Sequence, residues 1–145
     1  MTSFNKDYLL GQFQLIEDYL ARARTFASRT KERFVEDGIA VDAAIREITV
    51  LFETSHNIAK HLIAENGWRS PQSKAEAFDV LKEMGVVPES LANSFRAAGR
   101  FRNLVTYQTT MINNEMVYDI LKNHLDDFEK FANHVLLLLE ENENG

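Results

Sequence analysis

Apolar residues recur every three or four positions along most of the chain, the spacing that gives an α-helix one apolar face. The first seam predicts a helix over residues 6–26 and consists of Leu9, Phe13, Ile16, Leu20 and Ala23. The second predicts a helix over 41–65 and consists of Val41, Ile45, Ile48, Phe52, Ser55, Ala59 and Leu62. The charged stretch SRTKERFVEDG is expected to connect these two long helices.

Turn and cap residues divide the middle of the chain. Asn66-Gly67 supplies a C-terminal stop for the second helix. The stretch SKAEAFDVLKEMG predicts a shorter helix, with Ser73 as its N-cap and Gly85 past its end. These signals place a third helix after a short loop.

Two further helices are predicted in the last third of the chain. Pro88 suits the first turn of a helix that reaches about Val105. The polar stretch TYQTTMINN is expected to be a loop, after which Asn113 or Asn114 caps a last long helix. The residues of that helix expected to face inward are Leu121, Leu125, Phe128, Ala132, Val135 and Leu139.

No stretch alternates apolar and polar residues as a half-buried strand would. With only six glycines and two prolines, the chain shows no linker, repeat or low-complexity tract. Long helices joined by short connections favour an antiparallel bundle. The sequence therefore predicts an all-α protein, a four- or five-helix bundle, with residues 1–145 forming a single domain.

The chain contains no cysteine, which excludes disulfides and thiolate metal sites and favours a reducing compartment. Its first residues lack the basic and apolar regions of a signal peptide. The longest apolar run, Val135–Leu139, is too short to cross a bilayer. We therefore expect a cytoplasmic protein with no membrane partner.

A formal net charge of −6 makes wide non-specific binding to nucleic acid unfavourable. Between Glu89 and Glu115, however, there is no acidic residue, and this window contains Arg96, Arg100 and Arg102. One interpretation is a helix whose arginines pair with acids from other helices. The other is a local anion-binding patch, in which Arg102 presents its planar guanidinium to a phosphate.

Glu53 and His56 have the Glu-x-x-His spacing of di-iron bundles, but no second such pair exists. A structural or surface role for the chain's four histidines is the simpler interpretation. No Gly-rich phosphate loop, Ser-His-Asp pattern or zinc spacing is present. We therefore expect no metal and no cofactor, with metal binding through Glu53 and His56 as a weak alternative.

The run FRNLVTYQTTMINNEMVYDIL resembles the motif of the HepT-like HEPN proteins, small helical toxins of prokaryotic toxin–antitoxin pairs whose partner is a minimal nucleotidyltransferase. Arg102 and Asn103 match the Arg-Asn of that motif. Tyr107 stands where the family has its catalytic histidine, and Thr109 stands where it has the tyrosine that the partner can modify with AMP. The similarity extends over roughly residues 40–138.

This resemblance implies a homodimer that acts as, or derives from, a metal-independent endoribonuclease. Arg102 would bind the RNA phosphate, Asn103 would orient the loop, and Tyr107 would occupy the acid/base position. An ordinary phenol titrates near pH 10, so at neutral pH it stays protonated and is a poor general base. A catalytically inactive HEPN-fold module that binds a nucleotidyltransferase, nucleotide or RNA is the alternative.

The resemblance also implies supporting roles around this site. Arg96 and Arg100 would add positive charge, and Glu53 on the facing helix would hold Arg102 in place. The cognate partner would be a nucleotidyltransferase antitoxin. With Thr109 at its position, the usual tyrosine AMPylation cannot occur there, and Tyr107 is an alternative acceptor.

Overall fold

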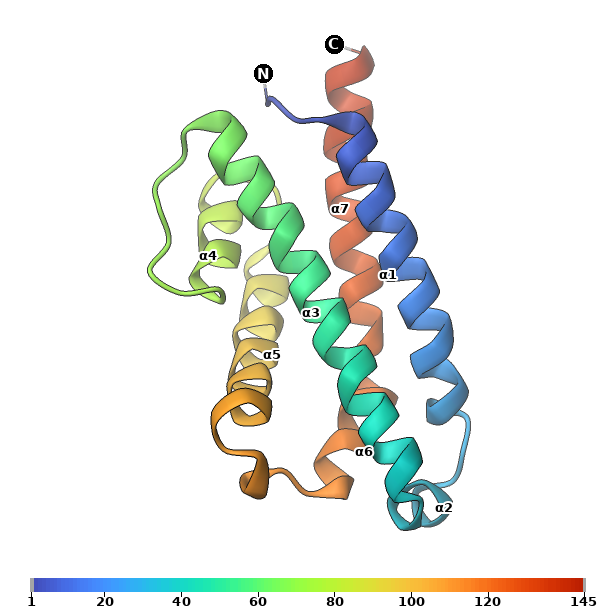
Figure 1. Ribbon diagram of the computed structural model, residues 1–145. Helices are drawn as coiled ribbons and strands as arrows, with labels where there is room; N and C mark the ends of the chain where they lie inside the picture. Colours follow the sequence, from blue (N-terminus) through green and yellow to red (C-terminus); the bar gives the residue numbers. More distant parts are fainter. Residues whose placement is uncertain (1, 145) are drawn as a thin grey trace.

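Four long helices run alternately down and up the molecule in the computed structural model, which describes residues 2–144 (Figure 1). These helices are α1 (Lys6–Ala27), α3 (Gly38–Asn66), α5 (Glu89–Tyr107) and α7 (Leu125–Asn144). Shorter elements join them: α2 (Lys31–Glu36), α4 (Glu76–Glu83), the 3-10 turn η1 (Thr109–Met111) and α6 (Asn114–Asn123). All regular structure in the described part of the chain is helical, which confirms the predicted fold class.

Local sequence signals start and stop these helices. Four helices begin at a residue whose side-chain oxygen accepts a hydrogen bond from the backbone N–H three positions later: Asn5, Thr30, Asp37 and Asn113. Such caps satisfy N–H groups that have no partner within the helix. Gly67 ends α3 with a positive φ of 65°, a conformation that glycine adopts without steric cost.

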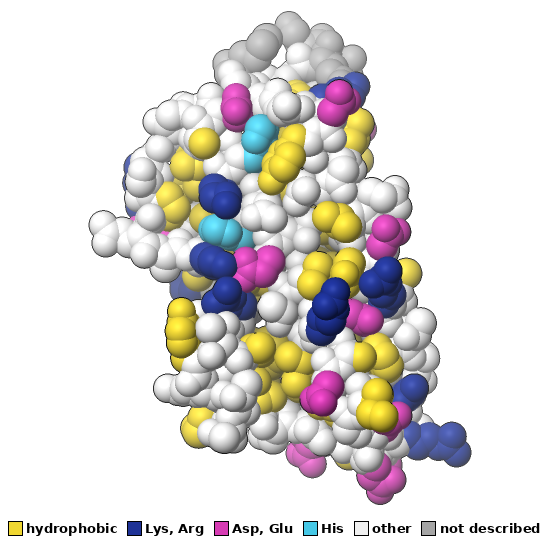
Figure 2. All heavy atoms as spheres, in the orientation of Figure 1, with side chains coloured by type: hydrophobic (Ala, Val, Ile, Leu, Met, Phe, Trp, Pro, Cys, Tyr) yellow, Lys and Arg dark blue, Asp and Glu magenta, His cyan; other side chains and the backbone are white. Residues whose placement is uncertain are grey.

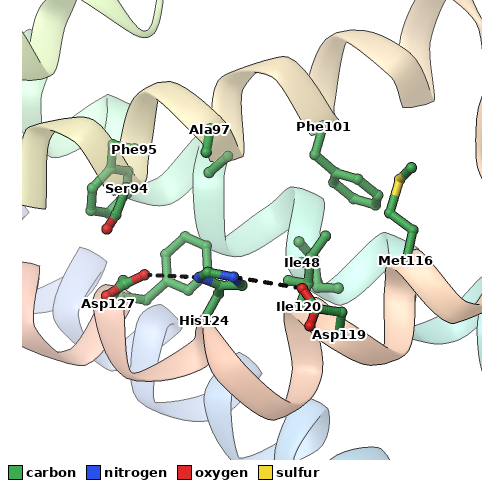
Figure 3. Close-up of a pocket in the computed structure, with 12 residues that line it drawn as sticks. Ile48, Ser94, Phe95, Ala97, Phe101, Met116, Asp119, Ile120, His124 and Asp127 are labelled. Atoms are coloured by element: carbon green, nitrogen blue, oxygen red, sulfur yellow. Dashed lines mark ion pairs between the residues drawn. The ribbon is translucent and has the colours of Figure 1, made fainter.

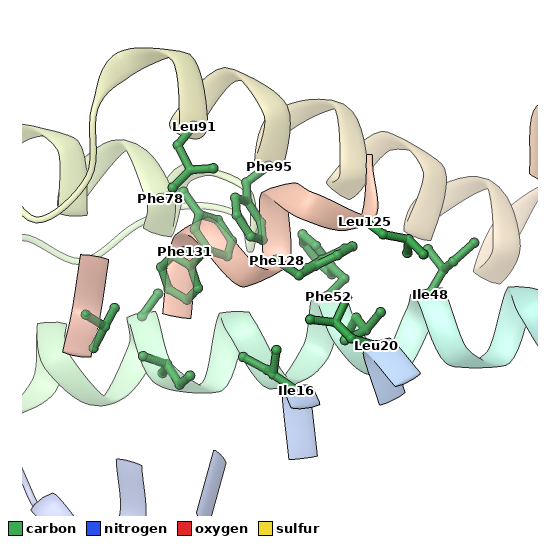
Figure 4. Packing of buried hydrophobic residues seen from close by; sticks show 14 of the residues in the cluster. Ile16, Leu20, Ile48, Phe52, Phe78, Leu91, Phe95, Leu125, Phe128 and Phe131 are labelled. Atoms are coloured by element: carbon green, nitrogen blue, oxygen red, sulfur yellow. The ribbon is translucent and has the colours of Figure 1, made fainter. Parts of the chain in front are cut away.

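The core is built around α3, which packs between α1, α5 and α7 (Figure 1). Five phenylalanine rings fill the space between α3, α4, α5 and α7: Phe52, Phe78, Phe95, Phe128 and Phe131 (Figure 4). The rings of Phe78 and Phe95 stack with centroids 4.2 Å apart. Phe128 meets the ring of Phe95 edge-on at 5.5 Å. This aromatic cluster fixes α5 against the remaining helices.

Several predicted helix ends differ from the structure: α3 begins at Gly38 instead of residue 41, and Pro88 precedes α5 as its N-cap. Ser73 does not begin α4, which starts at Glu76, although the Ser73 hydroxyl oxygen accepts the Glu76 N–H at 3.0 Å. The residues Thr106 and Tyr107, expected in a loop, form the last turn of α5. The backbone N–H of Gln108 still donates to the Leu104 carbonyl at 2.9 Å, so the helical hydrogen bonds continue past the predicted end.

The last long helix was predicted to be continuous, and this prediction is wrong. It is interrupted at His124, where φ is −126° and ψ is −3°, so α6 and α7 are separate helices. The imidazole of His124 lies between the carboxylates of Asp119 and Asp127, 3.7 and 3.5 Å away. Leu125, directly after the break, is buried.

The apolar seams lie where they were predicted. In α1, Leu9, Ile16, Leu20 and Ala23 are buried, and Phe13 is half-buried. The predicted inward residues of α6 and α7 are also buried, except that Ala132 is half-buried. None of the helices formed by residues 2–144 combines the length and the apolar character that a bilayer crossing requires.

Candidate functional site

Arg102 forms an ion pair with Glu53 across the interface of α5 and α3. The Nε of Arg102 donates to Oε1 of Glu53 at 2.6 Å. Both side chains are partly accessible, with 22% of Arg102 and 30% of Glu53 exposed to solvent. The contact expected between these two residues is therefore present, at a place where both side chains remain partly accessible to solvent.

Lys74 is the second partner of Glu53. It lies in the segment between α3 and α4, and its Nζ donates to Oε2 of Glu53 at 2.8 Å. Burial raises the pKa of the Glu53 carboxyl, but the hydrogen bonds from Lys74 and Arg102 outweigh burial and hold that pKa below its usual range. The carboxyl of Glu53 is therefore ionised at neutral pH.

Both carboxylate oxygens of Glu53 are thus occupied by cations, which disfavours a metal ion at the Glu53–His56 pair. Within residues 2–144, no three His, Cys, Asp or Glu side chains gather as a metal site requires. His124, expected on a helix, instead lies at the break between α6 and α7.

A glycine lets α5 approach the segment that carries Lys74. A Cβ built on Gly99 would lie 3.0 Å from the Cβ of Ala75 and 3.5 Å from Cζ of Phe52. The first distance is too short for a comfortable contact between two side chains. Because Ala75 follows Lys74 directly, the absent side chain at position 99 helps to place the Lys74 ammonium at Glu53.

His56 follows Glu53 by three residues and Lys60 follows His56 by four along α3, so the three side chains lie on the same side of that helix. Together with the segment before α4 they border a hollow of about 330 Å³, here called the His56 hollow. Its lining residues are His56, Lys60, Ile63, Pro71, Gln72, Ser73, Lys74 and Ala77. Figure 2 shows dark blue cations around an imidazole and a carboxylate on this face.

His56 is held neutral by its surroundings. Burial, followed by the positive charge of Lys74, lowers the pKa of His56 to about 4. Lys60 and Arg102 also act to lower that pKa, whereas Glu53 acts to raise it. The imidazole therefore carries no charge at neutral pH, and its ring can both accept and donate a hydrogen bond.

This pKa predicts a loss of stability on acidification. The unfolded chain binds a proton at His56 near pH 6.5, and the folded protein binds it only near pH 4, so stability falls as pH decreases between these values. After allowance for solvent screening we expect a loss of about 1–2 kcal/mol from this group. Urea denaturation at pH 7 and pH 4.5 measures it. The His56→Gln variant should lose less stability over this range, and an equal loss in both proteins would contradict the assignment.

The other predicted site residues lie on the outer side of α5 and beyond its end. Asn103 and Arg100 are exposed, and Tyr107, the last residue of α5, is 77% exposed. Thr109 is exposed at the start of η1. Arg96 forms an ion pair with Asp79 of α4, so for Arg96 the structure favours pairing with an acid of another helix.

A second pocket, of about 130 Å³, lies on the other side of α5, between α5, α6 and α7 (Figure 3). Phe95, Phe101 and Ile48 supply apolar walls, and the carboxylates of Asp119 and Asp127 flank His124 at its rim. Two carboxylates at the entrance repel a phosphate. This pocket therefore differs in chemistry from the His56 hollow, where no Asp or Glu lines the wall.

Lys74 and Lys60 are the residues that sequence reasoning missed. Lys74 lies outside the motif and outside every predicted seam, and only the folded chain brings it to Glu53. The nearest signal for Lys60 was its position one turn after His56 on a predicted helix. For His56, the sequence suggested a structural or surface role, with metal binding beside Glu53 as the alternative.

Comparison with known proteins gives a sequence relative. The mRNA nuclease HepT of Shewanella oneidensis is 24% identical over 99 residues, a match that covers 68% of this chain and 74% of the relative.

Solved structures with the same fold include a toxin–antitoxin crystal structure with AMP-PNP, with a TM-score of 0.85 and 21% identity over 90% of this chain and 98% of the other. A tri-AMPylated Shewanella oneidensis HEPN toxin in complex with MNT antitoxin gives 0.84 and 21% over the same shares. YutE from Bacillus subtilis, a cytosolic protein of unknown function, gives 0.83 and 20% over 98% of this chain and 95% of the other.

At these identities the superpositions show a shared fold. The assignment of the family comes from its sequence profile, described as Ribonuclease HepT-like, which matches residues 16–135. That range includes Glu53, Lys74, Arg102 and Tyr107. Because the match covers well over half of the sequence, the chain belongs to the Ribonuclease HepT-like family, as the motif around Arg102 predicted.

Proposed function

We propose that this protein is a toxin-type endoribonuclease that cleaves RNA without a metal ion. Cleavage of this kind needs a base for the attacking 2′-hydroxyl, stabilisation of charge on the phosphate oxygens, and an acid for the leaving oxygen. Family membership and the name of the Shewanella relative, an mRNA nuclease, support this reaction class. A nuclease of this class would act in the cytoplasm, where mRNA is found.

The orientation of Arg102 is the observation that carries the proposal. Glu53 accepts a hydrogen bond from Nε alone, and no described residue hydrogen-bonds to either Nη atom of Arg102. The edge formed by the two Nη groups therefore stays available for a bidentate contact with a phosphate. Glu53 acts as a positioning residue, since it fixes the guanidinium plane without occupying that edge.

Asn103 and Tyr107 complete the proposed site on the exposed side of the same helix end. Asn103 orients the loop or the neighbouring arginine, and the Tyr107 hydroxyl takes the acid/base position. Arg100 contributes positive charge beside them. Arg96 contributes only a distant field, because Asp79 already neutralises it.

The proposal includes a homodimer in which two copies of this helix end face one cleft. Two large side chains at this end, Tyr107 and Met111, are 77% and 63% exposed, which suits burial against a second copy.

A cognate nucleotidyltransferase antitoxin is the proposed partner, because similar folds occur in solved toxin–antitoxin complexes. With Thr109 in η1, any AMP transfer at this end would need another acceptor, such as Tyr107.

Incubation of the purified protein with mixed RNA in the presence of a chelator tests this function. We expect RNA fragments that end in a 2′,3′-cyclic phosphate, because the attacking group is the neighbouring 2′-hydroxyl. Size-exclusion chromatography with light scattering should give the mass of a dimer. A protein that leaves RNA intact under all these conditions, or that stays monomeric, would contradict the proposal.

The second candidate, an inactive HEPN-fold interaction module, is favoured by one observation: a tyrosine stands at the position where the family has histidine. Substitutions at Tyr107 separate the two candidates. If the protein is an enzyme, Tyr107→Phe should lower its cleavage rate by about 10²-fold, the size of a lost acid/base contribution. If it is an inactive module, Tyr107→His should create cleavage in an inert parent. Rates on one labelled RNA measure both.

A further inference from the structure

The His56 hollow combines positive charge with an open, polar rim. Lys60 and Lys74 supply two ammonium groups, and Lys60 forms no ion pair with any described residue. Lys74 and Arg102 share the carboxylate of Glu53, so the three cations and this one carboxylate together carry a net charge of +2. In a chain of net charge −6, such a group marks a local site for an anion.

One carboxylate links the hollow to the proposed catalytic arginine. Glu53 binds Arg102 through Oε1 and Lys74 through Oε2, at 2.6 and 2.8 Å. Lys74 is therefore a wall residue of the hollow and a neighbour of the arginine at the same time. An RNA strand whose phosphate contacts Arg102 would pass the opening of the His56 hollow if the strand continued along α3.

We propose that the His56 hollow binds a second backbone phosphate of the RNA strand whose scissile phosphate lies on Arg102. Lys60 and Lys74 contact the phosphate oxygens, and His56 donates a hydrogen bond to one of them. This inference rests on the proposed function, because it extends the same nucleic-acid site by one phosphate. It makes Lys60, Lys74 and His56 binding residues of the nuclease.

Binding at this position must be coupled to protonation of His56. In the free protein, the imidazole is neutral because burial and the cations Lys74, Lys60 and Arg102 disfavour its charged form, with Glu53 as the only opposing charge. A bound phosphate adds negative charge at the imidazole and so raises its pKa. The strand should therefore bind more tightly as pH falls toward 5, with uptake of a proton at His56.

The test uses a 2′-O-methylated RNA oligonucleotide, which lacks the attacking hydroxyl and measures binding without cleavage. Fluorescence anisotropy at several salt concentrations gives its affinity. We expect Lys60→Ala and Lys74→Ala each to weaken binding about 5–10-fold and to reduce the slope of log K against log salt by about one. Lys60→Arg should keep the affinity. Lys130→Ala, which removes an exposed lysine of α7, is the matched control and should leave it unchanged.

A titration of the His56 imidazole by NMR supplies an independent readout. Addition of the oligonucleotide should raise its pKa, and the His56→Gln variant should lose the pH dependence of binding. An unchanged His56 titration overturns the proposal. So does an affinity that depends on Arg102 and is unaffected by both lysine variants, an outcome that leaves the proposed arginine site intact.

Two further binding measurements show whether the phosphate in the His56 hollow belongs to RNA or to a free phosphate compound. If AMP or inorganic phosphate binds with the same dependence on Lys60 and Lys74 while the oligonucleotide does not need them, the ligand is a free phosphate and the RNA assignment is overturned. If the oligonucleotide binds through these lysines and the unmodified RNA is not cleaved, the subsite stands while the proposed nuclease activity fails.

Discussion

Phe95→Ala is expected to lower the free energy of unfolding by about 3–5 kcal/mol, the largest stability effect that we predict. The ring of Phe95 is 1% exposed and lies 4.2 Å from the ring of Phe78, with Phe131 at 5.1 Å and Phe128 at 5.5 Å. Truncation removes the buried area and these ring contacts, and it leaves a cavity that the surrounding aromatic groups cannot fill. Urea denaturation measures the change.

Phe95→Leu is the matched variant, since it keeps an apolar group of intermediate size at the same place. It should cost about half as much, because part of the volume remains filled. Total stabilities of domains are about 5–15 kcal/mol, so the alanine variant should still fold at low temperature. A change below about 1 kcal/mol for Phe95→Ala would show that the cluster relaxes around the cavity.

Arg102→Ala is expected to reduce RNA cleavage by about 10²–10³-fold, the effect of removing one donor aimed at developing negative charge. The variant would lose the proposed bidentate contact with the phosphate and would leave one oxygen of Glu53 unpaired to repel it. Stability should change by less than about 1 kcal/mol, because the ion pair is partly exposed. Initial rates on a labelled RNA, together with a denaturation curve, separate the two effects.

Arg102→Lys should retain an intermediate rate, because lysine keeps the charge but cannot form the planar bidentate contact. Arg24→Ala serves as control, since Arg24 is likewise an ion-paired arginine, with Asp126 and Glu129 as its partners, but lies on α1. It should change the rate less than twofold. Cleavage that persists in Arg102→Ala would exclude this site, whichever enzyme in the preparation was responsible.

The helices with strong seams could be predicted from sequence because their physical signal is local. Leu9, Ile16 and Leu20 repeat at helical spacing, and Asn66-Gly67 combines a helix end with a residue that tolerates positive φ. The break at His124 had no such signal, since no glycine or proline is near. It coincides with the burial of Leu125 and with two carboxylates around the imidazole, which are tertiary contacts.

Only part of the candidate site could be predicted from the sequence, for the same reason. Arg102 and Glu53 could be paired because a family resemblance supplied their relation in space. Lys74 lies 21 residues from its partner Glu53, at the start of a different predicted helix, so no local pattern connects them. The distribution of charge around His56 likewise depends on three elements that meet only in the folded chain.

Gly99 has a consequence for how this site tolerates change during evolution. It has no side chain, and a Cβ at this position would lie 3.0 Å from the Cβ of Ala75, the residue directly after Lys74. A larger residue at position 99, or an insertion in the connection before α4, would push that lysine outward and free one oxygen of Glu53. Substitution of this glycine can therefore change the electrostatics of the proposed site without altering any residue proposed to contact RNA.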